Sequence, residues 1–159
     1  MNRRQFIHAS ALLAVAGGSP AAGESAAGLV ELHRLGKGGL QPHVALGSDG
    51  TLHVAYLDGN PAEADVRIVR RGRTACCLTE PARVNRTDGA ALAIGSIRGV
   101  RCAVDARQRL HWVWNGSRRA VPQGPGGAPL LYTRSDPGGL NAEPERDLKG
   151  PSVHLDGGA

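Results

Sequence analysis

Hydrophobic and polar residues alternate clearly with a period of two in two short segments of the chain. In the segments 51–57 and 109–114, large apolar side chains occupy every second position. This period predicts β-strands with one buried face, and no helical period is found outside the first residues. The side chains expected on the apolar faces are Leu52, Val54 and Tyr56 in the first segment and Leu110, Trp112 and Trp114 in the second, with His53 and His111 on the opposite faces.

An internal repeat organises these strands. Three successive segments in the first half match three in the second half, with offsets of 58, 64 and 63 residues. The increase from 58 to 64 places an insertion in one loop. The matched segments are 45–56 with 103–114, 66–70 with 130–134, and 80–83 with 143–146.

Each repeat is predicted to contain four short strands. Turn signals separate them, among them Ser48-Asp49-Gly50, Gly59-Asn60-Pro61 and Asp136-Pro137-Gly138-Gly139. The strands expected in the first repeat are His43–Gly47, Thr51–Leu57, Val66–Arg70 and Ala82–Asn85. Those expected in the second are Val100–Val104, Arg109–Trp114, Leu130–Arg134 and a weak one near Arg146–Leu148.

Four-stranded units that repeat at about 60 residues are typical of β-propeller blades. We therefore expect an all-β partial propeller, with one blade at about 41–86, a second at about 99–149 and the start of a third from residue 151. A β-sandwich is the alternative, since it also uses short alternating strands. A closed propeller needs about four to eight blades, so we expect missing blades or self-association to close the ring.

The chain resembles the BNR or sialidase-like propeller families. The resemblance is carried by Asp49-Gly50-Thr51-Leu52-His53-Val54-Ala55-Tyr56, by Trp112-Val113-Trp114 and by Tyr132-Thr133-Arg134-Ser135-Asp136. Residues 135–140 lie where those families have an Asp-box turn, but they lack its spacing and its Thr-Trp. The resemblance implies a module that binds an extracytoplasmic glycan or protein. It also implies an alternative, an exo-sialidase-type glycoside hydrolase completed by missing blades, although no catalytic constellation can be assigned here.

Residues 1–26 are predicted to be a twin-arginine signal peptide. Arg3 and Arg4 precede the apolar stretch 9–16, which leads into small residues at 17–22. A basic start, a short apolar middle and a small-residue end are the three parts of a removable export signal. We therefore expect a prokaryotic protein that is periplasmic or secreted, with residues 27–159 forming the propeller fragment and contact with a membrane only during export.

The charge distribution and the low aromatic content argue against nucleic acid as a partner. The net charge is +5, and the 19 basic residues comprise 17 Arg and 2 Lys without any long basic run. Only 3% of the residues are aromatic, too few for a platform that stacks bases, so nucleic acid is not an expected partner.

Loops at one end of the predicted blades are the candidate ligand site. Propellers usually bind ligands where the loops leading into the first strands, and those between the second and third strands, surround the central channel. An acidic loop with Asp58, Glu63 and Asp65 would face basic residues of the second blade. Alternatively, these are solvated loops with weak surface pairs. The candidate ligand-binding residues are His43, Arg98, Arg101, Asn115, Arg118 and Arg119.

Other residues are interpreted as structural, and neither a metal site nor a cofactor is expected. His53 and His111 are repeat-equivalent, which favours packing over metal binding. Trp112 and Trp114 are expected in the core between blades rather than in a sugar platform. The three cysteines fit no zinc pattern and are expected to be small buried residues or to form one disulfide; they are Cys76, Cys77 and Cys102.

Overall fold

The computed structural model describes residues 32–33, 35, 38–94, 99–124, 129–137 and 141–149. The chain divides into two units, residues 1–32 and residues 33–159. The predicted signal peptide and the predicted start of a third blade lie outside the described residues. Within the described ranges the regular structure is entirely β, and no helix there is long and apolar enough to cross a membrane.

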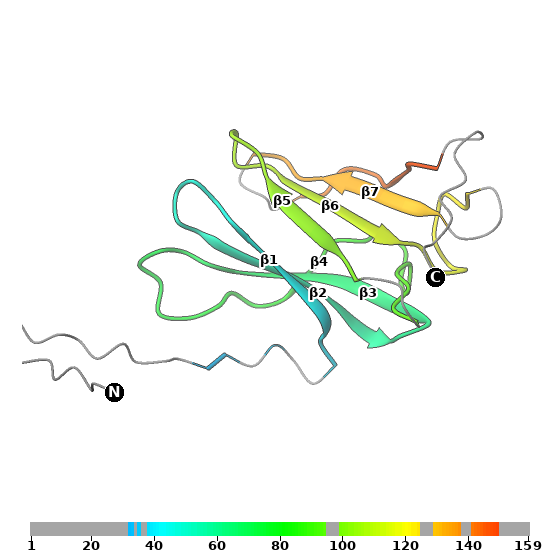
Figure 1. The fold of residues 1–159 in the computed structure, drawn as a ribbon, viewed down its shortest axis with the longest axis horizontal. Coiled ribbons are helices and arrows are strands. Elements are labelled where there is room, and N and C mark those ends of the chain that lie inside the picture. Colours follow the sequence, from blue (N-terminus) through cyan, green and yellow to red (C-terminus); the bar gives the residue numbers. More distant parts are fainter. Residues whose placement is uncertain are drawn as a thin grey trace, which may run out of the picture. The chain divides into compact units, whose positions relative to one another are not determined.

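The first sheet contains four antiparallel strands in the order of the chain (Figure 1). They are β1 (Leu40–Leu46), β2 (Leu52–Asn60), β3 (Glu63–Arg71) and β4 (Ala82–Arg83). Each strand overlaps a segment predicted from the sequence, although β2 and β3 are longer because the hairpin between them is tight.

The second sheet repeats the same antiparallel order. Its strands are β5 (Arg101–Val104), β6 (Leu110–Asn115), β7 (Leu130–Arg134) and β8 (Arg146–Asp147). The predicted all-β fold of two four-stranded antiparallel units is therefore confirmed.

The strand registers confirm the repeat and correct one of its offsets. His53 pairs with Arg70 in the first sheet, and His111 pairs with Arg134 in the second, as the offsets of 58 and 64 require. For the fourth strands the sequence match at offset 63 is wrong by one residue. The amide of Thr79 donates to the carbonyl of Arg70, and the amide of Glu143 donates to that of Arg134. These hydrogen bonds keep the offset at 64, whereas the sequence match had followed the shared Glu-Pro pair.

The turn before the second strand has the same backbone in both repeats. The amide of Gly47 donates to the carbonyl of Thr51, and the amide of Asp105 donates to that of Arg109. Gly50 has φ +80° and its equivalent Gln108 has φ 60°, so each turn contains a left-handed residue at the same place. A glycine adopts this conformation without steric cost, which explains Gly50 but not Gln108.

The two sheets pack through faces that are not equivalent. We call the face with Leu52, Val54 and Tyr56 in the first sheet, and that with Leu110, Trp112 and Trp114 in the second, the front face. The opposite face, which carries His53 or His111, is the back face. The main core joins the back face of the first sheet to the front face of the second. Its largest members are Leu57, Val66, Ile68, Leu110, Trp112, Trp114 and Leu131.

This front-to-back contact is the one that neighbouring propeller blades make. The front face of the first sheet lies away from the main core, where Val54, Tyr56 and Val69 pack with Leu35 and Leu78. A sandwich related by a two-fold axis would instead bring equivalent faces together. The two sheets therefore have a propeller-like blade arrangement.

Two further contacts hold the sheets together. The first strands of the two sheets, β1 and β5, are neighbours. At one end, Ala91 lies between the sheets: its carbonyl accepts from the amide of Ala64 at 2.9 Å, and the amide of Leu92 donates to the carbonyl of Asn115 at 2.9 Å. The segment that links the sheets thus continues the hydrogen bonding across their junction.

Candidate functional site

His43, one of the predicted ligand-binding residues, connects the two sheets. The backbone amide of Cys102 donates to His43 Nδ1 at 3.3 Å, and the Cys102 thiol lies 3.5 Å from the same nitrogen. Burial raises the pKa of the Cys102 thiol, while a weaker backbone hydrogen bond from Ala55 opposes the shift. The His43 ring therefore satisfies an edge amide of β5, and Cys102 is the small buried residue that was expected.

Arg101 and Asn115 lie at the beginning of β5 and at the end of β6. Arg101 borders a cavity of about 220 Å³ together with Gln41, Pro42, Gly99 and Val100. The Asn115 carbonyl accepts the hydrogen bond from Leu92 that joins the sheets. Arg98, the neighbouring candidate, lies outside the described residues.

Arg118 and Arg119 lie in the loop after β6, beside the β2–β3 hairpin. Arg119 Nη1 is 3.3 Å from Glu63 Oε2, and both side chains are about half exposed. Arg118 and Glu63 line a cavity of about 420 Å³, which Leu92 and Ile94 also border. The structure thus brings these two arginines to the acidic hairpin, although an ion pair this exposed contributes about 1 kcal/mol or less.

The acidic residues of this hairpin are held by partners. Burial is the largest single effect on Asp65 and would raise its pKa. Hydrogen bonds from Asn85 Nδ2 at 2.9 Å and from the Gly89 amide at 2.8 Å, together with the charge of Arg67, outweigh it and lower the pKa. Asp58 lies 3.6 Å from Arg67. Asp65 is therefore held ionised and is unsuited to act as a general acid.

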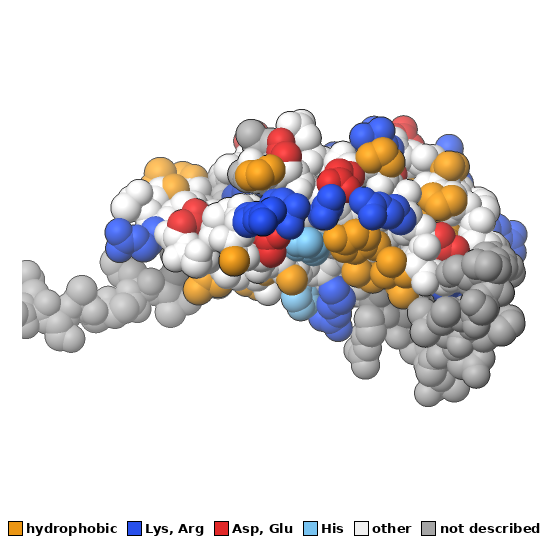
Figure 2. All heavy atoms as spheres, turned by 90° about the horizontal axis from the view of Figure 1, so that it is seen from above, with side chains coloured by type: hydrophobic (Ala, Val, Ile, Leu, Met, Phe, Trp, Pro, Cys, Tyr) orange, Lys and Arg blue, Asp and Glu red, His pale blue; other side chains and the backbone are white. Residues whose placement is uncertain are grey.

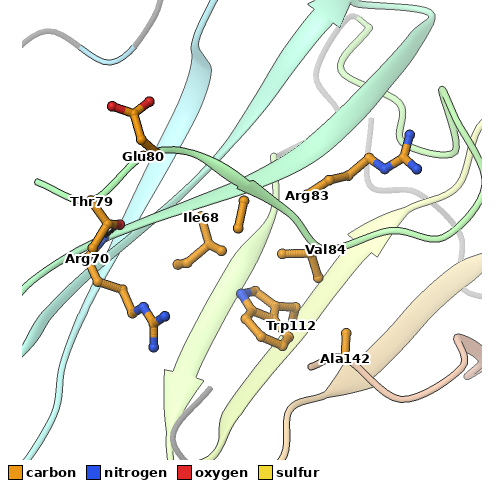
Figure 3. A pocket seen from close by; sticks show the side chains of 9 residues that line it. Ile68, Arg70, Thr79, Glu80, Arg83, Val84, Trp112 and Ala142 are labelled. Atoms are coloured by element: carbon orange, nitrogen blue, oxygen red, sulfur yellow. Dashed lines mark hydrogen bonds between the residues drawn. The ribbon is translucent and has the colours of Figure 1, made fainter. Parts of the chain in front are cut away.

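A pocket of about 280 Å³ opens at the junction of the sheets (Figure 3). It differs from the predicted site because it is built from β3, the segment around β4, and β6. Apolar side chains form its walls, while polar and charged ones lie around them. The lining residues are Ile68, Arg70, Thr79, Glu80, Ala82, Arg83, Val84, Trp112 and Ala142.

Trp112 lines the pocket and carries a buried hydrogen-bond donor. The side chain is 2% exposed, and its Nε1 finds no acceptor among the residues that the structure describes. Figure 3 shows this nitrogen on the side of the ring nearer Ile68 and Arg70. A buried donor without a partner costs about 1–3 kcal/mol, so an acceptor in the pocket would recover that energy. Trp114 Nε1 is also buried without an acceptor among the described residues, but Trp114 does not line the pocket.

The charged residues of the pocket favour an anionic group. Arg70 and Arg83 contribute two guanidinium groups against one carboxylate, Glu80. Arg83 also forms an ion pair with the exposed Asp88. The pocket thus combines an indole side chain, apolar walls and two guanidinium groups, of which that of Arg83 is already paired with Asp88.

A polar network on the back face of the second sheet was missed by the sequence interpretation. His111 Nδ1 lies 2.8 Å from the hydroxyl of Tyr132, and His111 Nε2 lies 3.3 Å from Asp105 Oδ2. The pKa of Asp105 is lowered, and the hydrogen bond from the backbone amide of Arg109 is the largest cause. Burial, the second largest effect, opposes the shift, and hydrogen bonds from the Arg109 and His111 side chains add to the lowering. Figure 2 draws one whole face of the molecule, seen from above the view of Figure 1, on which a row of Lys and Arg side chains lies beside histidine side chains and an apolar area.

The two repeat-equivalent histidines therefore differ. His53 is buried at the junction, as its interpretation as a packing residue requires. His111 is instead part of the polar network. The sequence contains a signal for this network. At the positions equivalent to Gly47 and Ile68 of the first repeat, the second repeat has Asp105 and Tyr132, which are the partners of His111.

The structure also shows the state and exposure of the three cysteines. Cys76, Cys77 and Cys102 are all thiols, and the first two are exposed rather than buried. The segment around Cys76 and Cys77 crosses the surface as a loop, which explains the difference. Among the described residues, no group of three or more His, Cys, Asp or Glu side chains is placed to hold a metal ion.

Comparisons with known proteins found no match: no family model and no curated protein matches this chain. Its function must therefore be inferred from its own residues and geometry.

Proposed function

We propose that the chain supplies two adjoining blades of an exported, sialidase-like β-propeller module, which binds an extracytoplasmic glycan or protein through an acidic group. The observation that carries the ligand proposal is the buried Trp112 indole N–H, which has no acceptor in the pocket it lines. The resemblance of residues 49–56 and 132–136 to sialidase-like propellers supports the choice of a glycan.

A carboxylate is the acceptor that suits this pocket best. One carboxylate oxygen would accept from Trp112 Nε1, while Arg70 or Arg83 would balance the charge. At about 280 Å³ the pocket is slightly smaller than the ~300–1,000 Å³ typical of sites for drug-sized ligands. It would therefore hold one acidic sugar residue or one acidic side chain rather than a whole oligosaccharide.

Further blades or a second copy are proposed to cover the outer faces. On the front face of the first sheet, Val44 is 54% exposed and Leu46 is 68% exposed. Apolar side chains at the equivalent positions of the second sheet, Cys102 and Val104, pack in or against the main core. The front face of the first sheet has the composition that a neighbouring blade would cover.

The binding proposal can be tested by nuclear magnetic resonance, because the chain has only two tryptophans. The ¹⁵N-labelled protein would be titrated with glucuronate, with N-acetylneuraminate and with neutral glucose. We expect the Trp112 indole signal to shift with the acidic sugars while that of Trp114 stays in place. Equal shifts with glucose would contradict an acidic ligand, and no shift at millimolar acidic sugar would contradict the site.

Matched variants sharpen this titration. Trp112→Phe assigns the indole signal and removes the donor. Arg70→Gln is expected to weaken binding about tenfold or more, because a hydrogen bond to a charged group is worth about 1.5–3 kcal/mol. Arg109→Gln is the control, since Arg109 binds Asp105 on the second sheet and does not line the pocket. A loss of binding in this control equal to that in Arg70→Gln would argue against a specific pocket.

Export is tested separately. Residues 1–26 would be fused to a reporter that is active only after twin-arginine transport, in a bacterium that has this route. We expect activity outside the cytoplasm, and its loss when Arg3 and Arg4 are both replaced by Lys. Export that is unaffected by the double replacement would contradict the twin-arginine assignment.

A further inference from the structure

The loop between β3 and β4 presents two adjacent thiols at the surface. Cys76 and Cys77 are both exposed, and their sulfur atoms lie 3.2 Å apart. The backbone bends at these two residues, which brings the side chains together. The third cysteine, Cys102, is buried on β5 in contact with His43 and is separate from this pair.

We propose that Cys76 and Cys77 form a reversible dithiol–disulfide site, which is oxidised by exchange with small disulfides such as oxidised glutathione. One thiolate attacks the small disulfide, so a mixed disulfide forms and one small thiol is released. The second thiolate then attacks the protein sulfur of the mixed disulfide. The Cys76–Cys77 bond forms, and a second small thiol leaves.

The exchange is balanced in atoms and electrons. The two protein thiols lose two electrons and two protons, and the small disulfide gains both as it becomes two thiols. The proximity of the sulfurs favours the second step over persistence of the mixed disulfide, because the second thiol is already beside the first.

This disulfide is expected to be reduced easily. Pairing of adjacent cysteines closes an eight-membered ring that strains the peptide between them, and strained, exposed disulfides have more oxidising potentials than structural ones. The ring would also lie next to a packed residue, because Leu78 follows Cys77 and packs against Val54, Tyr56 and Val69. The site therefore fits a reversible switch in the loop rather than a permanent staple.

The test is to incubate the reduced, folded full chain with millimolar oxidised glutathione, quench it with acid and measure the intact mass. We expect the loss of two hydrogen atoms, with peptide mapping that places the bond between Cys76 and Cys77, and full reversal by dithiothreitol. Phenylarsine oxide, which bridges two close thiols with the release of water, should bind only the reduced form.

Variants separate the outcomes. Cys102→Ala should oxidise as the natural chain does, whereas Cys76→Ser should stop at a stable glutathione adduct on Cys77. A lasting adduct on the natural chain, a bond that includes Cys102, or no reaction would each overturn the proposal. Neither thiol lines the ligand pocket, so these results test the redox proposal and not the ligand proposal.

Discussion

The two sheets share one strand plan, but their back faces meet different surroundings. In the first sheet, Leu57 and Ile68 are buried in the main core. At the equivalent positions of the second sheet, Asn115 and Tyr132 are only half buried. The same alternation of residues therefore builds an interior in one repeat and a polar surface in the other.

The difference in side-chain polarity is confined to the back face of the repeat. The front faces of both sheets are apolar, from Leu52 and Val54 in the first to Leu110 and Trp112 in the second. The comparison shows that a period of two identifies a strand, while the chemistry of each face reports what lies against it.

The largest expected effect comes from the buried back face. Leu57→Ala should lower the free energy of unfolding by about 2–5 kcal/mol, because it removes fully buried methyl groups and leaves a cavity. Asn115→Ala, at the equivalent position, should cost about 1 kcal/mol or less. Urea denaturation measures both. Equal losses in the free energy of unfolding would contradict the difference between the back faces, since they would mean that both are covered in solution.

A smaller effect on the free energy of unfolding is expected from the ionisation of His53, because only one group titrates. Burial, and then the charge of Arg70, lower the pKa of His53, while Asp49 opposes the shift. Below about pH 6.5 the unfolded chain takes up a proton that the folded state resists, so the free energy of unfolding should fall as the pH decreases toward the folded-state pKa.

His53→Gln should reduce this dependence on pH, and Arg70→Gln should shift the folded-state pKa of His53 upward. Denaturation at a series of pH values measures the first, and a histidine titration by nuclear magnetic resonance measures the second. An unchanged slope between His53→Gln and the natural chain would contradict the buried position of this ring.

The smallest effect is expected at the loop contact between the sheets. Arg119→Gln should cost about 1 kcal/mol or less, since the ion pair with Glu63 is about half exposed, and salt should reduce the difference further. A double-mutant cycle with Glu63→Gln measures the coupling. A coupling of several kcal/mol that persists at high salt would show that this loop, and not the apolar junction, holds the sheets together.

The strands were predictable from the sequence because alternation and turn residues are local signals. The segments 51–57 and 109–114, predicted from apolar side chains at every second position, overlap the observed strands Leu52–Asn60 and Leu110–Asn115. Which face of each sheet packs against the other sheet was not predictable, since Leu52 and Leu110 occupy equivalent positions but pack against different neighbours.

The candidate site was predictable only in part. The contact of Arg119 with Glu63 follows from the order of the strands, which places both loops at one end. The pocket beside Trp112 depends instead on side-chain packing between residues far apart in sequence, such as Ile68 and Ala142. No local pattern reports such a contact.

The front-to-back packing also makes the structure directional. A pair joined by equivalent faces is self-limiting, because each partner has used the only surface that it offers. In front-to-back packing, one apolar or packing face remains unused at each end of the pair. Tandem duplication of the coding segment would therefore add a sheet that packs through the same kind of contact as the sheets already present. Module number can then change by whole steps during evolution, without the invention of a new interface.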